Sequence, residues 1–160
     1  MALRIARFAN LMLASVLVGN EFGSWAAVHP ALAALPTGAH VRAEQAVTRR
    51  YGRLMPAVMA ATVASCLPVL ALTPDRRSAA YRGTLGGLLA FLAMLGVTFA
   101  GNLPLNRRVL ALSADDPPAG WPALRARWDR WHTLRNALNL AGLACLLLGA
   151  LAAPDHRAAD

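Results

Sequence analysis

Residues 121–152 read WPALRARWDRWHTLRNALNLAGLACLLLGALA, with no helix breaker after Pro122. A single helix over this stretch would be roughly 48 Å long at about 1.5 Å per residue, which exceeds the apolar core of a bilayer. Its C-terminal part, 137–153, is apolar enough to cross that core. The first turns of the helix are therefore expected to stand in the headgroup layer or beyond it.

A line of polar and aromatic side chains runs along one face of this helix. Spacings of four and three residues alternate between its members, and such spacings place side chains on a single helix face. A histidine, an arginine or an asparagine on the inner face of a membrane helix needs polar partners. The line therefore predicts a polar pocket inside a bundle. Its members are Trp121, Arg125, Trp128, His132, Arg135 and Asn139.

The rest of the chain has the composition of a membrane protein. It has 160 residues, of which 57% are hydrophobic and 15% charged, and its mean hydropathy is +0.43. Such a chain is too apolar for an ordinary soluble domain. Further stretches at 8–28, 54–72 and 84–105 are long enough to span a bilayer. We expect one all-α domain over 1–160, a four-helix transmembrane bundle with a long fourth helix extending beyond the membrane.

The net charge is +8, its basic residues are all arginines, and the sixteen arginines lie outside the four predicted spans. We expect them to meet the headgroups of the lipid bilayer, because no nucleic-acid-binding motif accompanies them. The first apolar stretch is expected to stay as a span, since Asn20 and Glu21 interrupt the apolar run that a cleaved signal would need. We expect an integral protein of a bacterial inner (plasma) membrane. The sequence leaves its oligomeric state open.

The connections carry smaller expectations. Pro68 lies within the second apolar stretch and is expected to kink the helix or end it early. Residues 40–53 are expected to lie at the membrane interface. His40 and His156 are expected in solvated loops, and Cys66 and Cys145 as apolar fillers among small residues.

Two residues within the spans are candidates for chemistry. Glu21 is the only acidic residue in the predicted spans, and an ionised carboxylate there needs a cation, for which Arg135 is the expected partner. A purely structural ion pair is the alternative. His132 shares its face with Trp128, Arg135 and Asn139 and suits a general base, with structural hydrogen bonding and metal ligation as alternatives.

The third stretch ends in Asn102-Leu-Pro-Leu-Asn106, which sets two amides one turn apart. These amides could stabilise an oxyanion, or they could cap the last carbonyls of the helix. His29 could pair with His132 on haem or copper, but no cluster of cysteines or carboxylates completes such a site. No metal and no other cofactor is therefore predicted.

Four elements together resemble the anthrone oxygenase-like family of integral membrane proteins: Glu21 with His29-Pro30, Tyr51-Gly-Arg-Leu-Met-Pro56, Asn102-Leu-Pro-Leu-Asn106, and Trp128-x3-His132-x2-Arg135. The resemblance covers nearly the whole chain, in the same order. It implies four membrane helices and the oxidation of an anthrone's central methylene by O2, with no established metal or organic cofactor.

If that activity carries over, the partners are an apolar aromatic small molecule and O2. His132 would take the proton, and Arg135, Asn102 and Asn106 would stabilise the oxygen anion. Trp128, Glu21, Asn139 and His29 would contact the substrate. The alternatives are a non-catalytic membrane component or small-molecule binder, and a haem or copper redox protein that uses His29 and His132.

Overall fold

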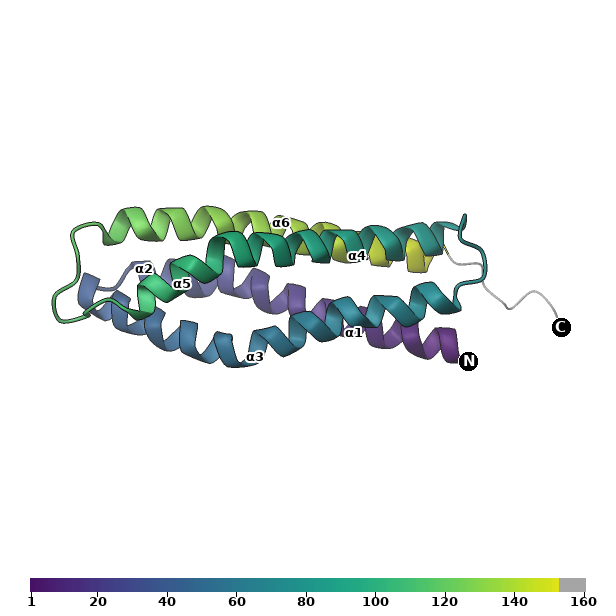
Figure 1. The fold of residues 1–160 in the computed structure, drawn as a ribbon, viewed down its shortest axis with the longest axis horizontal. Coiled ribbons are helices and arrows are strands. Elements are labelled where there is room, and N and C mark those ends of the chain that lie inside the picture. The colour runs from purple at the N-terminus through teal and green to yellow at the C-terminus, as the bar shows by residue number, and fades with distance from the viewer. Residues whose placement is uncertain (153–160) are drawn as a thin grey trace.

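The computed structural model describes residues 1–152, which form four long antiparallel helical rods, with the start of the first rod and the end of the last rod at the same end of the bundle (Figure 1). Each rod is long and apolar enough to cross a membrane, and the described part contains no strand. The predicted all-α four-helix membrane bundle is confirmed. The first rod is α1 (Ala2–Gly23), η1 (Ser24–Val28) and α2 (His29–Ala33); the second is α3 (Thr37–Leu72); the third is α4 (Ala79–Val97), η2 (Thr98–Asn102) and α5 (Leu103–Leu110); the fourth is α6 (Trp121–Leu151).

The helices are longer than the predicted spans. The segment predicted to lie at the interface, 40–53, is continuous with the second span in one 36-residue helix. Pro68 does not end this helix, which continues to Leu72. In lipid, backbone groups find hydrogen-bond partners only within their own helix, so ending the helix would leave several groups unpaired. The helix therefore continues although Pro68 lacks a backbone N–H.

The interpretation of Asn102 and Asn106 as helix caps required the third rod to end at this pair, but the rod does not end there. It continues through the π-helical segment η2 and α5 to Leu110. Pro104 lies in the first turn of α5, where its missing N–H is harmless. Asn102 and Asn106 are therefore within the rod and do not cap its C-terminal carbonyls.

The helices α4 and α6 approach each other closely through glycines. A Cβ on Gly83 would lie 2.6 Å from the carbonyl oxygen of Cys145 and 2.7 Å from Cα of Gly149. A Cβ on Gly142 would likewise meet the ring of Phe91 at 2.9 Å. Small residues at a helix crossing let the backbones pack, which is the usual way that helices associate in lipid.

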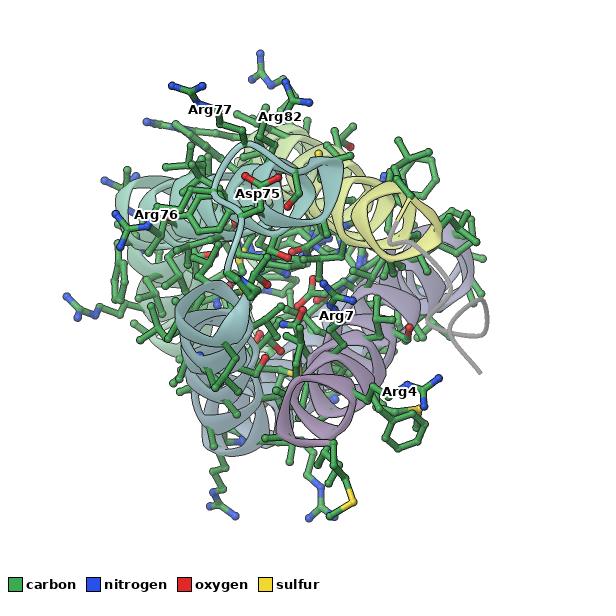
Figure 2. The ribbon with its side chains drawn as sticks, turned by 90° about the vertical axis from the view of Figure 1, so that its right-hand side faces the viewer. Arg4, Arg7, Asp75, Arg76, Arg77 and Arg82 are labelled. Carbon is green, nitrogen blue, oxygen red and sulfur yellow. The ribbon has the colours of Figure 1, made fainter. Side chains whose placement is uncertain are left out.

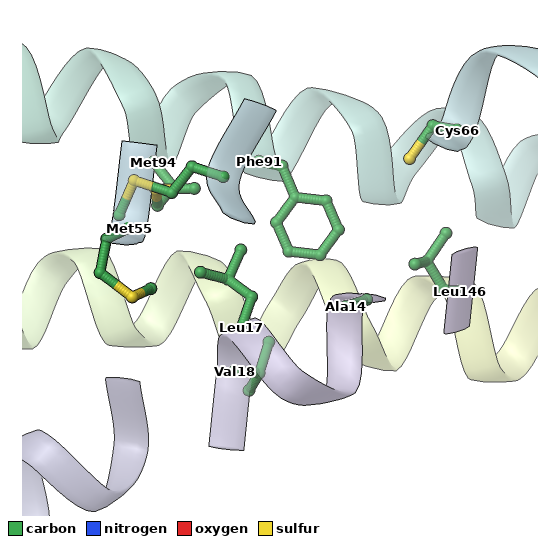
Figure 3. Close-up of a cluster of buried hydrophobic side chains, with 9 residues drawn as sticks. Ala14, Leu17, Val18, Met55, Cys66, Phe91, Met94 and Leu146 are labelled. Carbon is green, nitrogen blue, oxygen red and sulfur yellow. The ribbon is translucent and has the colours of Figure 1, made fainter. Parts of the chain in front are cut away.

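A cluster of apolar side chains from all four rods forms the core (Figure 3). Leu17, Cys66, Phe91 and Met94 are completely buried in it. At the end of the bundle that carries the termini, Arg4, Arg76, Arg77 and Arg82 spread outward around the rim (Figure 2). Basic residues at such a rim fit the predicted contact with lipid headgroups.

Candidate functional site

Glu21 of α1 and Arg135 of α6 form a buried ion pair. Nη2 of Arg135 donates to Oε2 of Glu21 at 2.6 Å and to Nδ1 of His132 at 2.9 Å. The Glu21 side chain is only 1% exposed. The pairing that the sequence predicted is confirmed, and it ties the first helix to the fourth.

A second buried cluster surrounds Glu44 of α3, which the sequence analysis missed. Oε1 of Glu44 lies 2.9 Å from Nδ1 of His29, and Oε2 lies 3.2 Å from Nη1 of Arg125. Glu21 was predicted to be the only acidic residue in a span, because residues 40–53 were predicted to lie at the membrane interface. Arg125 lies on the same inner face of the fourth helix as Arg135, and a buried arginine needs a charged partner. This residue could have indicated a second buried acid.

His40 belongs to this second cluster and is not a solvated loop residue. It is buried, its Nε2 lies 3.4 Å from Oε1 of Glu44, and its Nδ1 accepts a hydrogen bond of 3.2 Å from the indole of Trp121. The spacing of four between His40 and Glu44 places both on one face of α3. His156 lies outside the described residues.

Trp128 lies between the two clusters. Its ring centroid is 4.5 Å from that of His29 and 4.5 Å from that of His132. Cζ of Arg125 lies 4.3 Å from the same ring, and the indole N–H donates to Oδ1 of Asn106 at 2.6 Å. Protein groups therefore surround this indole and fix its position.

The geometry of His29 and His132 does not favour a shared haem. Their rings meet edge to face with centroids 5.3 Å apart, which leaves no room for a porphyrin plane between them. Within residues 1–152, no group of three or more His, Cys, Asp or Glu side chains is placed to hold a metal ion.

A cavity of about 250 Å³ opens beside the Glu21–Arg135 pair. Its lining is mostly apolar, and its polar lining includes residues of α1, α2, α3, α5 and α6. A cavity with apolar walls and a few converging polar groups is the usual form of a small-molecule site. The apolar walls include Met55, Pro56, Met59, Leu95, Phe99 and Leu103; the polar and aromatic lining includes Glu21, His29, Tyr51, Asn106, Trp128 and Arg135.

A second hollow, of about 450 Å³, lies on the other side of His29. Its lining includes Trp25, His40, Arg125, Asp129 and His132. His29 is the residue among the predicted site positions that lines both spaces. It therefore forms part of the wall between them.

The predicted site residues converge only in part. Glu21, His29, Asn106, Trp128 and Arg135 line the first cavity, whereas the lining of that cavity within residues 1–152 does not include the remaining three. His132 lines the second hollow. Asn102 and Asn139 are completely buried, and their amide groups have no hydrogen-bond partner in the described part of the chain.

Two π-helical segments position residues of this site. The segment η1 ends at Val28, directly before His29, and η2 ends at Asn102. The i→i+5 pattern of a π-helix interrupts the regular α-helical register and occurs frequently at functional sites. The helical spacings used in the sequence analysis could not foresee either segment.

These features define an integral membrane helical bundle with a largely apolar cavity that is also lined by a few polar side chains. Residues 44–145 match the family model described as anthrone oxygenase. The match covers more than half of the chain, which therefore belongs to this family. The matched range begins at Glu44, while Glu21 and His29 precede it. No curated protein and no solved structure matches the chain.

Proposed function

We propose that the protein uses O2 to oxidise an anthrone-like or phenolic aromatic molecule held in the first cavity, without a cofactor. The observation that carries this proposal is the apolar-walled cavity of about 250 Å³ whose lining includes Arg135, Glu21 and Asn106. Membership in the anthrone oxygenase family supplies the reaction class. The apolar walls suit fused rings, and the polar lining residues suit the oxygen of the substrate.

The chemistry uses the acidity of the substrate itself. Removal of a proton from the central methylene leaves an anion that is an aromatic phenolate, and this anion passes one electron to O2. The superoxide and the ring radical then combine at the methylene carbon, and protonation gives a hydroperoxide. Loss of the second C–H proton breaks the O–O bond and releases water, so one anthrone and one O2 give one anthraquinone and one water.

Asn106 and Arg135 stabilise the oxygen anion in this scheme. Oδ1 of Asn106 already accepts the indole N–H of Trp128, so the amide is held with its NH2 group available to donate. The guanidinium of Arg135 adds positive charge to the lining of the same cavity. Fixed donors and charges in a site that excludes water stabilise a developing anion strongly.

The remaining predicted residues take supporting roles. Trp128 holds Asn106 and the histidine rings in place, because its ring is already surrounded by protein groups. His132 accepts from Arg135 and fixes the direction of that guanidinium. Asn102 and Asn139 reach the substrate only if their unpartnered amides turn toward the cavity.

The direct test is oxygen uptake by the purified protein in lipid nanodiscs with emodin anthrone. Mildly acidic buffer keeps the spontaneous oxidation of the anthrone slow. We expect protein-dependent consumption of one O2 per anthrone and the absorption spectrum of the quinone. Binding of the anthrone without oxygen uptake would contradict the proposal and favour the non-catalytic small-molecule binder.

A further inference from the structure

We infer that His29 is the general base of this reaction and that Glu44 is the carboxylate that positions it. The inference rests on the proposed function, which requires a group to take the methylene proton. His29 is the first residue of α2, directly after η1, and it lines the substrate cavity. From the sequence, His132 was predicted to accept the proton, and His29 was predicted only to contact the substrate.

The hydrogen bonds around Glu44 fix the tautomer of His29. Arg125 lies 3.2 Å from Oε2 and keeps the carboxylate in its charged, acceptor-only form. Oε1 lies 2.9 Å from Nδ1 of His29, whereas Nη2 of Arg125 lies farther from that nitrogen, at 3.4 Å, and already donates to Asp129 at 2.7 Å. We therefore assign the ring proton to Nδ1, which donates it to Glu44. The lone pair of the neutral imidazole is then on Nε2, which has no hydrogen-bond partner within residues 1–152 and is free to accept a proton.

His40 and Trp121 hold the carboxylate from its other side. An indole N–H can only donate, so Nδ1 of His40 is an acceptor at 3.2 Å and the proton of His40 is on Nε2. That proton points to Oε1 of Glu44 at 3.4 Å. The same oxygen that receives the His29 proton is thereby kept in place, which is how an orienting carboxylate preserves the reactive tautomer of a catalytic histidine.

The two competing bases lack a free lone pair at the cavity. A guanidinium can only donate, so Nδ1 of His132 is occupied by Arg135 at 2.9 Å, and His132 lines the second hollow instead. Oε2 of Glu21 is occupied by the same guanidinium at 2.6 Å. Oε1 of Glu21 is unpartnered but almost completely covered by protein atoms.

In the step we propose, the methylene C–H bond breaks, its electron pair stays on the ring as the phenolate, and the proton moves to Nε2 of His29. The imidazolium is stabilised by Glu44. After O2 has added to the carbon, the same proton returns to the terminal peroxide oxygen. His29 is then neutral again and accepts the second C–H proton as the O–O bond breaks, and it passes that proton to the departing hydroxide to form water.

Chemical rescue tests the role of His29. We expect His29→Ala to lower anthrone-dependent oxygen uptake by about 10²- to 10⁴-fold, the usual contribution of a general base. Added imidazole should restore part of the rate, 4-methylimidazole should restore more, and the less basic 4-bromoimidazole should restore less. A ring that only fills space would show no dependence of rescue on basicity, and that result would overturn the inference.

A double-mutant cycle tests whether Glu44 acts through His29. Glu44→Gln should lower turnover by at least about tenfold in the wild-type background and change it little in the His29→Ala background. Asp115→Asn is the matched control, because it neutralises an exposed carboxylate paired with Arg42 of the same α3 helix. Its turnover should equal that of the wild type.

The outcomes separate the two proposals. An active wild-type protein whose His29→Ala and Glu44→Gln variants keep full turnover would overturn the inference and leave the oxygenase function standing. Equal losses from Glu44→Gln in both backgrounds would overturn the positioning role. A wild-type protein without oxygen uptake removes both proposals together. If Glu44→Gln does not accumulate in membranes, Glu44→Asp, which keeps the charge and shifts the carboxylate, takes its place in the cycle.

Discussion

The two halves of the bundle are held together by different forces. Near the termini, α4 and α6 pack backbone to backbone at Gly83 and Gly149. Toward the α2 and α5 end, buried ion pairs connect the helices, as Arg135 does with Glu21. Figure 1 shows α4 and α6 side by side in the half of the bundle where α1 begins, whereas α5 diverges from α6 in the opposite half.

The difference follows from what each kind of contact requires. Helices in lipid gain little from apolar burial, so small residues that permit close packing stabilise their association. Charged side chains are longer and must reach a partner, which keeps the backbones apart. The helices therefore pack tightly in the half that contains Gly83 and Gly149. In the half that contains the buried ion pairs, they leave room for the cavity beside Glu21 and Arg135.

The largest effect is expected from breaking the inner ion pair. Glu21→Leu leaves the guanidinium of Arg135 buried with only His132 as a partner, and such a loss destabilises by about 3–5 kcal/mol. Thermal unfolding of the detergent-solubilised protein measures it. The double variant Glu21→Leu/Arg135→Met should regain most of the stability without regaining activity. A double variant as unstable as the single one would show that the pair does not act through charge compensation.

The next effect concerns catalysis in the charged half. Asn106→Leu removes the amide that we assign to the substrate oxygen and should lower turnover by about 10²- to 10³-fold. Oxygen uptake at saturating anthrone measures this loss. Trp128→Phe removes the indole donor to Asn106 but keeps the amide, so its loss should be smaller. Asn20→Leu, on the exposed side of α1, controls for a change of asparagine to leucine in the membrane.

In the glycine half, Gly83→Ala should destabilise by about 1–3 kcal/mol, because the added methyl meets backbone atoms that cannot rotate away. Gly96→Ala is the matched control in the same helix, since nothing lies within 4 Å of its added Cβ. Unfolding of both variants in detergent measures the difference. Equal stabilities would indicate that the close crossing of α4 and α6 adjusts easily.

The smallest effect is expected at an exposed ion pair near the charged end. Arg42 and Asp115 lie 2.7 Å apart with side chains 58% and 93% exposed, and solvent screens such pairs. Asp115→Asn should change the free energy of unfolding by less than about 0.5 kcal/mol. A larger loss in the same unfolding assay would mean that the loop before α6 is held by this contact.

The polar line on the fourth helix could be read from sequence because helical periodicity is local. Trp121, Arg125, Trp128, His132, Arg135 and Asn139 are all buried as predicted. The pairing of Glu21 with Arg135 was also accessible, since a lone acid in a span and an arginine on an inner face each require a partner. Hydropathy located all four spans, although it underestimated their lengths.

Glu44 and His40 could not be found in this way, because hydropathy excluded their polar segment from the bundle. Their segment is continuous with the span in one helix, and only the packed arrangement shows that its inner face is buried. The sequence by itself determined the four helices and which face of the last one turns inward, since both follow from the periodicity of nearby residues. Only the tertiary structure brings Glu44, His29 and Arg125 together, because these residues are distant in the sequence and meet only where three of the rods pack.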